Sequence, residues 1–207
     1  MITLRIGESN QHRRWARRIA QAIGLTLGLV AAALAAATPA SAATSKAAYS
    51  WHVADQLLED AVGSPPVAIA AAPNGDTIEL DGTGVMDVAA KTASGGGAVT
   101  HKNATGAVLA TGTFQATRLT SFQFYGCQDL GLGVPLCGGL AKLEVTIHVD
   151  GTNLSFPSIL SIDCLIGDKI PAGADTPARH EGIKLNVKDV INFNHTHHSG
   201  FTVFIPQ

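Results

Sequence analysis

The chain has 207 residues, of which 46% are hydrophobic and 14% are charged, and its formal net charge is −2. Residues 43–207 hold nine Lys and Arg against fifteen Asp and Glu, a net charge of −6, whereas residues 1–42 are basic. An acidic domain without a basic patch is a poor candidate for binding nucleic acid or an anionic membrane surface. Its length is that of one domain, which can bury a core without metals or many disulfides.

Residues 1–42 have the three parts of a cleavable signal peptide. A basic segment, 1–18, precedes an uncharged segment rich in Ala and Leu, 19–37, and a short segment of small residues with one Pro, 38–42. A membrane anchor is the alternative, because about 19 apolar residues can span a bilayer. The Pro and the small residues favour cleavage after Ala42. We therefore predict a secreted or periplasmic protein that has no stable membrane anchor after cleavage.

Residues 43–66 are predicted to form a tether followed by a short amphipathic helix. Apolar residues recur at helical spacing over 50–62, and acidic residues lie on the opposite side. Ser50 is suited to cap the start of this helix, and Gly63, followed by two prolines, is suited to end it. We expect the helix to pack on a sheet and to have a structural role.

Residues 67–207 are predicted to form an all-β domain of roughly eight to ten strands. Apolar and polar residues alternate over 76–126 and again over 143–150, and Asn74-Gly75 predicts a hairpin turn. Short turns without intervening helices favour a single antiparallel β-barrel or β-sandwich over a parallel sheet. The alternation breaks near Arg118, as it does at a β-bulge, and long bulged strands favour the barrel.

Three cysteines follow the predicted signal peptide. Cys127 and Cys137 bracket a short loop that contains Gly and Pro, and cysteines of exported proteins tend to pair. We predict a Cys127–Cys137 disulfide, although three cysteines allow three pairings. Cys164 lies in an apolar run, at alternate positions with Leu160 and Ile162, and is predicted to be a small buried side chain.

The main candidate metal site is a polar segment near the C-terminus. If this segment is extended, His195 and His197 point to the same face, where two imidazoles can bind one divalent metal. Further ligands for that metal are sought among His148, His180 and Glu181. The alternative is a solvated turn, because Asn, Thr, Ser and Gly are ordinary turn residues, and the sequence favours this alternative.

Acidic and aromatic residues supply weaker candidates. The paired acids on strand faces, which we expect to be solubilising, are Glu79 with Asp81 and Glu144 with Asp150. Asp163 lies in an apolar run; it is either a buried acid or, as the pattern favours, exposed beside Ser161. Phe122 and Phe124 are expected to belong to the core rather than to a ligand platform, and Tyr125 is expected to face the other way.

The sequence leaves three functions open. The first is an exported binding or accessory module for a small molecule, a glycan or a protein partner. The second is a metal-binding protein or metal-dependent enzyme that uses His195 and His197; a divalent metal is the one cofactor that the sequence suggests. The third is a structural envelope or interaction protein without a pocket. Because the chain has few charges, abundant Gly and Thr and no recognisable motif, the sequence favours the first and third over the second.

Overall fold

The computed structural model describes residues 48–174, 180–196 and 199–207. The predicted signal peptide, the first residues of the predicted tether and His197 lie outside these ranges. Within them the one helix is α1 (Gln56–Val62). No described helix is apolar and long enough to cross a membrane.

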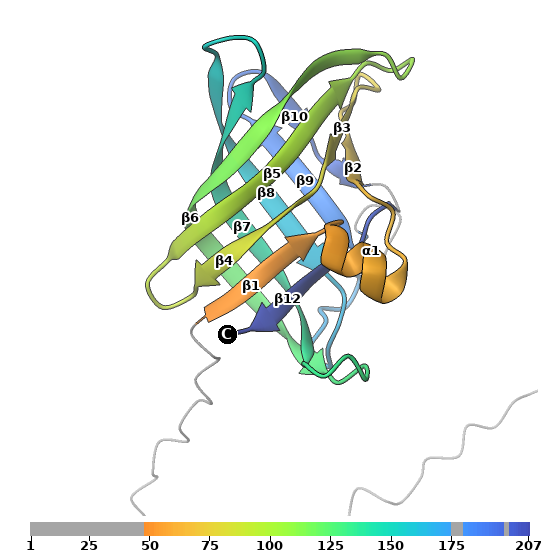
Figure 1. Ribbon diagram of the computed structural model, residues 1–207, viewed down its shortest axis with the longest axis vertical. Helices are drawn as coiled ribbons and strands as arrows, with labels where there is room; N and C mark the ends of the chain where they lie inside the picture. Colours follow the sequence, from red (N-terminus) through yellow and green to blue (C-terminus); the bar gives the residue numbers. More distant parts are fainter. Residues whose placement is uncertain (1–47, 175–179, 197–198) are drawn as a thin grey trace, which may run out of the picture. The chain divides into compact units, whose positions relative to one another are not determined.

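The described strands form one antiparallel sheet of 12 strands (Figure 1). The prediction of an all-β domain with one short helix is therefore confirmed. The strands are β1 (Ala48–Val53), β2 (Ala68–Ala71), β3 (Thr77–Leu80), β4 (Gly82–Asp87), β5 (Thr92–Lys102), β6 (Val108–Gln128), β7 (Leu136–Val149), β8 (Ser155–Cys164), β9 (Gly182–Val187), β10 (Ile191–Phe193), β11 (His195–Thr196) and β12 (Thr202–Pro206).

Six of the strands form a partial ring, in the order β1, β4, β5, β6, β7 and β12. We call this the six-strand ring. Its two longest members, β6 and β7, shift register between Ala116 and Arg118, where the sequence predicts a bulge. Such a shift bends the strand, which helps a sheet to curve into a ring.

The sheet continues beyond the six-strand ring on both sides. β3 and β2 follow β5, while β8, β9 and β10 follow β7. β10 pairs with β9. The next strand along the chain, β11, is separated from β10 only by Asn194 and pairs with β2. One short stretch of chain thus bridges the two ends of the sheet. We call the space between β3 and the strands β5 to β10 the pocket region.

Large side chains fill the six-strand ring. Tyr49, Trp51 and Phe204 are at most 2% exposed. The ring of Phe122 lies 5.2 Å from that of Tyr49 and 5.0 Å from that of Phe204, between centroids. A Cβ on Gly84 would lie 2.5 Å from the Trp51 ring, so glycine at this position leaves room for the indole.

The predicted helix begins six residues later than its pattern indicates. Tyr49, Trp51 and Val53 also alternate at strand spacing, and all three are buried on one face of β1. Because β1 pairs with β4 on one side and with β12 on the other, this segment forms a strand and not the first turns of the helix. Asp55 therefore caps the helix in place of Ser50, since its Oδ1 accepts a hydrogen bond of 3.2 Å from the backbone N–H of Leu58.

The end of the helix and the first hairpin agree with the sequence. Gly63 ends α1 with a φ of 67°, in the left-handed region that glycine adopts without strain. β2 and β3 form the hairpin predicted from Asn74-Gly75, with Ala71 paired with Thr77.

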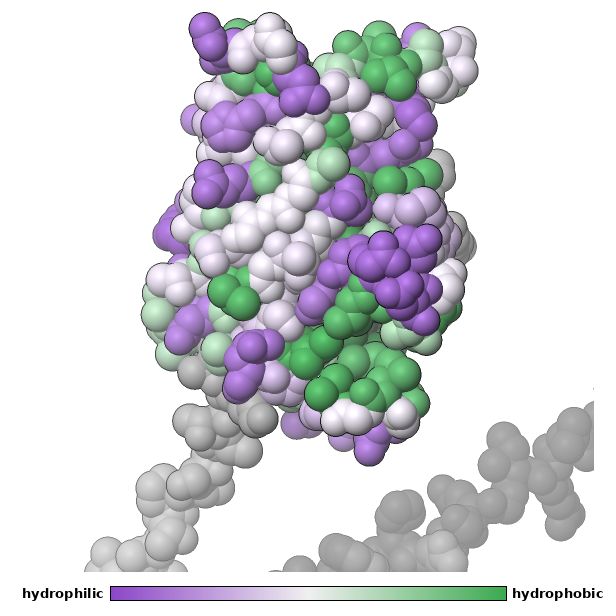
Figure 2. Space-filling view, in the orientation of Figure 1, coloured by the Kyte–Doolittle hydropathy of each residue, from purple (hydrophilic) through white to green (hydrophobic). Residues whose placement is uncertain are grey.

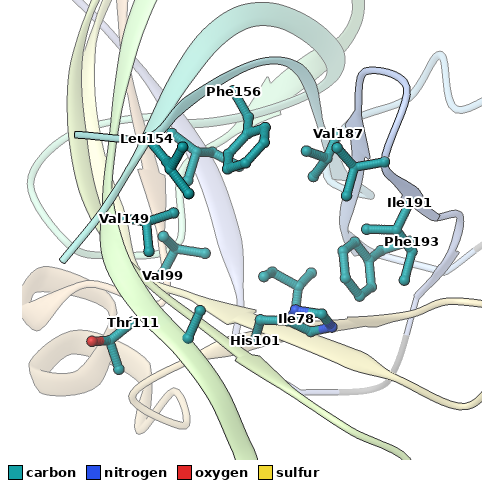
Figure 3. A pocket seen from close by; sticks show the side chains of 13 residues that line it. Ile78, Val99, His101, Thr111, Val149, Leu154, Phe156, Val187, Ile191 and Phe193 are labelled. Atoms are coloured by element: carbon teal, nitrogen blue, oxygen red, sulfur yellow. The ribbon is translucent and has the colours of Figure 1, made fainter. Parts of the chain in front are cut away.

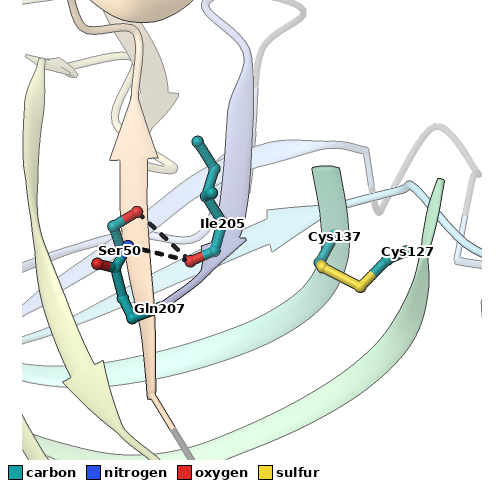
Figure 4. The surroundings of a disulfide bond; sticks show 5 residues. All are labelled: Ser50, Cys127, Cys137, Ile205 and Gln207. Atoms are coloured by element: carbon teal, nitrogen blue, oxygen red, sulfur yellow. Dashed lines mark hydrogen bonds between the residues drawn. A yellow bond between two sulfur atoms is a disulfide. The ribbon is translucent and has the colours of Figure 1, made fainter. Parts of the chain in front are cut away.

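The first and last strands among the described residues, β1 and β12, lie side by side (Figure 4). Ser50 pairs with Ile205, and the backbone N–H of Gln207 donates a hydrogen bond of 3.1 Å to the carbonyl of Ala48. The same view shows the Cys127–Cys137 disulfide, which joins β6 to β7 as the sequence predicts.

Candidate functional site

An apolar pocket of about 280 Å³ occupies the pocket region (Figure 3). Eleven of its thirteen lining residues are apolar, and the other two are His101 and Thr111. Leu154 and Val190, which lie in the β7–β8 and β9–β10 turns, are 57% and 61% exposed. The pocket therefore opens to solvent between these turns.

Strand alternation explains why the lining is apolar. Val99 and His101 lie on one face of β5, and Ile147 and Val149 lie on one face of β7, because residues two apart point to the same side of a sheet. β9 contributes Val187 in the same way. Short aliphatic side chains from opposite walls do not meet in the middle, so a space remains.

Phe193 forms one wall of the pocket beside His101. It is 1% exposed, and β10, to which it belongs, pairs it with Leu185 of β9. The rings of Phe193 and His101 meet edge to face, with centroids 5.3 Å apart. The aromatic ring thus limits the orientations open to the imidazole.

The polar atoms at the pocket are held by acids in two turns. His101 Nε2 lies 3.1 Å from Asp76 Oδ2, and Asp76 is fixed in the β2–β3 turn by a hydrogen bond from its N–H to Asn74 Oδ1. The Thr111 hydroxyl donates to Asp150 Oδ2 at 2.8 Å. The hydroxyl hydrogen of Thr111 is therefore already engaged, whereas the second ring nitrogen of His101, Nδ1, makes no hydrogen bond with the described residues.

Among the described residues, the predicted metal ligands His148 and His195 lie on separate strands. His148 is exposed on β7, at a position between the inward residues Ile147 and Val149. His195 is exposed in β11 and pairs with Ala71, far along the sheet order from β7. No three His, Cys, Asp or Glu among the described residues are grouped to hold a metal. His197 lies outside these residues, so its part in the prediction is untested.

Glu181 and Asp163 lie where the ends of β8 and β12 meet. Glu181 accepts hydrogen bonds of 3.2 Å from the backbone N–H groups of Leu165 and Thr202, and burial raises the pKa of its carboxyl. Thr202 donates a further hydrogen bond of 2.8 Å to the carbonyl of Asp163. These contacts connect strand ends, which is a structural role. His180, the other predicted ligand in this loop, is partly buried.

The burial of Asp163 differs from the exposed position that the sequence pattern favours. The sequence places it with Ser161 on a wet face, but the side chain of Asp163 is only 7% exposed. Both residues line a small recess on the outer side of the sheet, together with His180 and Gly182. His180, which precedes β9, lies beside this recess, and period-two alternation carries no information about such a neighbour. Next to Asp163, Cys164 is fully buried and outside any disulfide, as predicted, and burial raises the pKa of its thiol.

The other predicted acids lie in surface pairs or on strand faces. Glu144 pairs with Arg118, which lowers the pKa of its carboxyl, and Glu79 Oε1 accepts a hydrogen bond of 2.6 Å from Lys102 Nζ. Burial raises the pKa of Asp81. None of these acids lines the apolar pocket.

The aromatic candidates belong to the core. Phe122 and Phe124 pack against the main core cluster, and both lie near the ring of Tyr49. Tyr125 has the opposite parity, as expected, but is also fully buried. This set offers no open platform to a ligand.

A second apolar surface lies at the β6–β7 turn, which is drawn at the lower right of Figure 2. The exposed residues of that turn are Leu130, Leu132 and Val134, at 51%, 43% and 43%. This surface is a projecting loop and does not enclose space for a ligand.

The sequence interpretation did not identify the pocket residues. The one available signal was His101, which shares a strand face with Val99 and so stands as a polar residue on an apolar face. Comparison with family models, with curated proteins and with solved structures gave no match. The function is therefore argued from the geometry of the pocket.

Proposed function

We propose that this protein is an exported binding module that holds a small, largely apolar molecule in the pocket region. The observation that carries the proposal is the open space of about 280 Å³ lined almost entirely by apolar side chains. An apolar cavity of about 150 Å³ is sufficient to bind benzene. The pocket therefore has room for a molecule of about two fused aromatic rings, near the lower end of typical ligand sites of roughly 300–1,000 Å³.

The lining also supports a small apolar ligand over a glycan. A sugar presents many hydroxyl groups, each of which needs a hydrogen-bond partner when water is removed. Of the thirteen lining residues only His101 and Thr111 carry polar side chains. Burial of apolar ligand surface contributes about 25 cal/mol per Å², so an apolar molecule gains affinity from the whole wall.

Export is the second part of the proposal. It is supported by the basic, apolar and small-residue segments of 1–42 and by the Cys127–Cys137 disulfide, since disulfides persist in oxidising compartments. A purely structural envelope role is less well supported, because a structural barrel has no need of an open apolar pocket.

The proposal is tested by titrating the exported protein with the fluorescent probe 1-naphthylamine, whose two fused rings match the size of the pocket. Ala110→Trp places an indole in the pocket, whereas Leu109→Trp places the same side chain on the opposite face of β6. We expect saturable binding that Ala110→Trp weakens by at least about tenfold, or about 1.4 kcal/mol, while Leu109→Trp changes it by less than about twofold. The proposal is wrong if the unmodified protein does not bind the probe, or if both variants weaken binding equally.

Native and denaturing mass spectra of the exported protein add an independent test. The denatured mass reports cleavage after Ala42 and oxidation of two thiols, and the native mass reports a bound molecule. We expect an organic adduct that Ala110→Trp removes and Leu109→Trp retains. A metal-sized excess that disappears in a His195→Ala/His197→Ala variant would instead favour the metal-binding alternative.

A further inference from the structure

The polar side of the pocket indicates what chemical group its ligand carries; this inference rests on the proposed function. Within the lining, only His101 has a side-chain polar atom that is not already engaged with an acid outside the pocket wall. The specificity of the pocket for polar groups therefore depends on the state of this imidazole.

Asp76 determines which nitrogen of His101 carries the hydrogen. An ionised carboxylate only accepts hydrogen bonds, so Nε2, which lies 3.1 Å from Asp76 Oδ2, must be the N–H donor. In a neutral imidazole the other nitrogen, Nδ1, then has a free lone pair and acts as an acceptor. The Asp76 contact is the one hydrogen bond of this ring within the described ranges.

The imidazole is also held in place by its neighbours. Phe193 contacts it edge to face at an interplanar angle of 83°, and Figure 3 shows the ring on the pocket wall beside Ile78. A ring that is fixed by a carboxylate on one side and by a phenyl ring on another presents its acceptor in a constant direction. Such preorganisation favours a ligand whose donor matches that direction.

We infer that the ligand is an apolar alcohol or phenol, whose hydroxyl group donates a hydrogen bond to His101 Nδ1 while its apolar body fills the pocket. Asp76 is the positioning residue, because it holds His101 in the tautomer that accepts. A ligand carboxylate is disfavoured, since it brings a negative charge towards both the Nδ1 lone pair and Asp76. An ether or a ketone has no donor and leaves Nδ1 unpaired.

The inference is tested with 1-naphthol and 1-methylnaphthalene, two ligands of nearly equal shape that differ in a hydroxyl group. Each displaces the fluorescent probe from the unmodified protein and from His101→Leu, at about pH 8, where free imidazole is neutral. We expect the ratio of the two affinities to shift against 1-naphthol by about fivefold to tenfold in His101→Leu, the effect of one hydrogen bond. The affinity for 1-methylnaphthalene should not fall.

The outcomes separate this inference from the proposed function. If both compounds bind and the ratio is the same in His101→Leu, the hydroxyl does not contact His101 and the inference is wrong, while the pocket still binds apolar ligands. If neither compound displaces the probe at its solubility limit, the proposed function itself fails.

A spectroscopic measurement tests the tautomer without relying on a variant. The ¹⁵N chemical shifts of the His101 ring should show a protonated Nε2 and an unprotonated Nδ1, and 1-naphthol should shift the Nδ1 resonance while 1-methylnaphthalene should not. In Asp76→Ala we expect the two nitrogens to share the hydrogen and the preference for 1-naphthol to decrease. A protonated Nδ1 in the unmodified protein would overturn the inference.

Discussion

The six-strand ring and the pocket region share strands β5, β6 and β7 but enclose different interiors. In the six-strand ring the inward residues include Tyr49, Trp51 and Phe204, whose rings fill the space. In the pocket region the corresponding positions carry short aliphatic side chains such as Val99 and Val187, and a space of about 280 Å³ remains.

This difference shows that one sheet can enclose a filled core in one part and an open space in another. The interior of a closed sheet widens as strands are added, so the side chains needed to fill it grow with the number of strands. Residues from β3 and from every strand from β5 to β10 line the pocket, and few of their side chains are large. Large aromatic side chains therefore fill the six-strand ring, whereas the pocket region keeps an open space.

The largest expected effect on stability is in the six-strand ring. Trp51→Ala removes a fully buried indole from the core, and we expect the free energy of unfolding to fall by about 3–5 kcal/mol. Urea unfolding followed by far-UV circular dichroism measures this loss. Val85→Ala, on the neighbouring strand but 48% exposed, is the control and should cost well under 1 kcal/mol, in the range of about 0.5 for surface substitutions.

A matched pair of valines compares the two regions directly. Val53 and Val187 are 0% and 7% exposed, but Val187 borders the pocket. Part of its side chain therefore faces open space, and truncating it to alanine removes fewer packing contacts. We expect Val53→Ala to cost about 2 kcal/mol and Val187→Ala about 1 kcal/mol in the same urea assay. Equal costs would contradict the presence of an open space beside Val187.

The smallest expected effect is a pH dependence at the contact between the two regions. Glu181 accepts hydrogen bonds from Thr202 of the six-strand ring and from Leu165, which follows β8. Burial raises the pKa of Glu181 in the folded protein, so the folded state binds more protons than the unfolded state above the ordinary carboxyl pKa of about 4.3. Stability from this group is therefore present below that pKa and is lost as pH rises through the folded pKa.

The variant Glu181→Gln does not titrate and isolates this effect. We expect the unfolding free energy of the unmodified protein to decrease relative to that of the variant as pH rises from about 4 to about 7. Parallel curves for the two proteins would show that Glu181 does not contribute to the pH dependence.

Much of the fold follows from local patterns in the sequence. The alternation over 143–150, the hairpin turn at Asn74-Gly75 and the Cys127–Cys137 pair each depend on residues close in the chain, and each is present in the structure. The segment 50–53 fits two patterns, because Tyr49, Trp51 and Val53 alternate as in a strand while the apolar residues over 50–62 recur at helical spacing. Pairing with β12, more than 140 residues away, decides between the two patterns.

The pocket could not be predicted in the same way. Its lining comes from strands spread between Ile78 and Phe193, and each lining residue is of an ordinary core type. Whether such side chains meet or leave a space depends on strand order and on the width of the sheet, which alternation does not report. His101 is the exception, because a histidine on an apolar strand face needs a polar partner, and Asp76 supplies it.

The pairing of β1 with β12 has a consequence for the order of folding. β5 to β10 pair largely with their neighbours in the chain, so the walls of the pocket can assemble from successive hairpins. The six-strand ring closes only when Ser50 meets Ile205, a separation of 155 residues, and such distant contacts form slowly. We therefore expect the walls of the pocket to appear early in refolding, and the aromatic core of the six-strand ring to form last, after β12 is available.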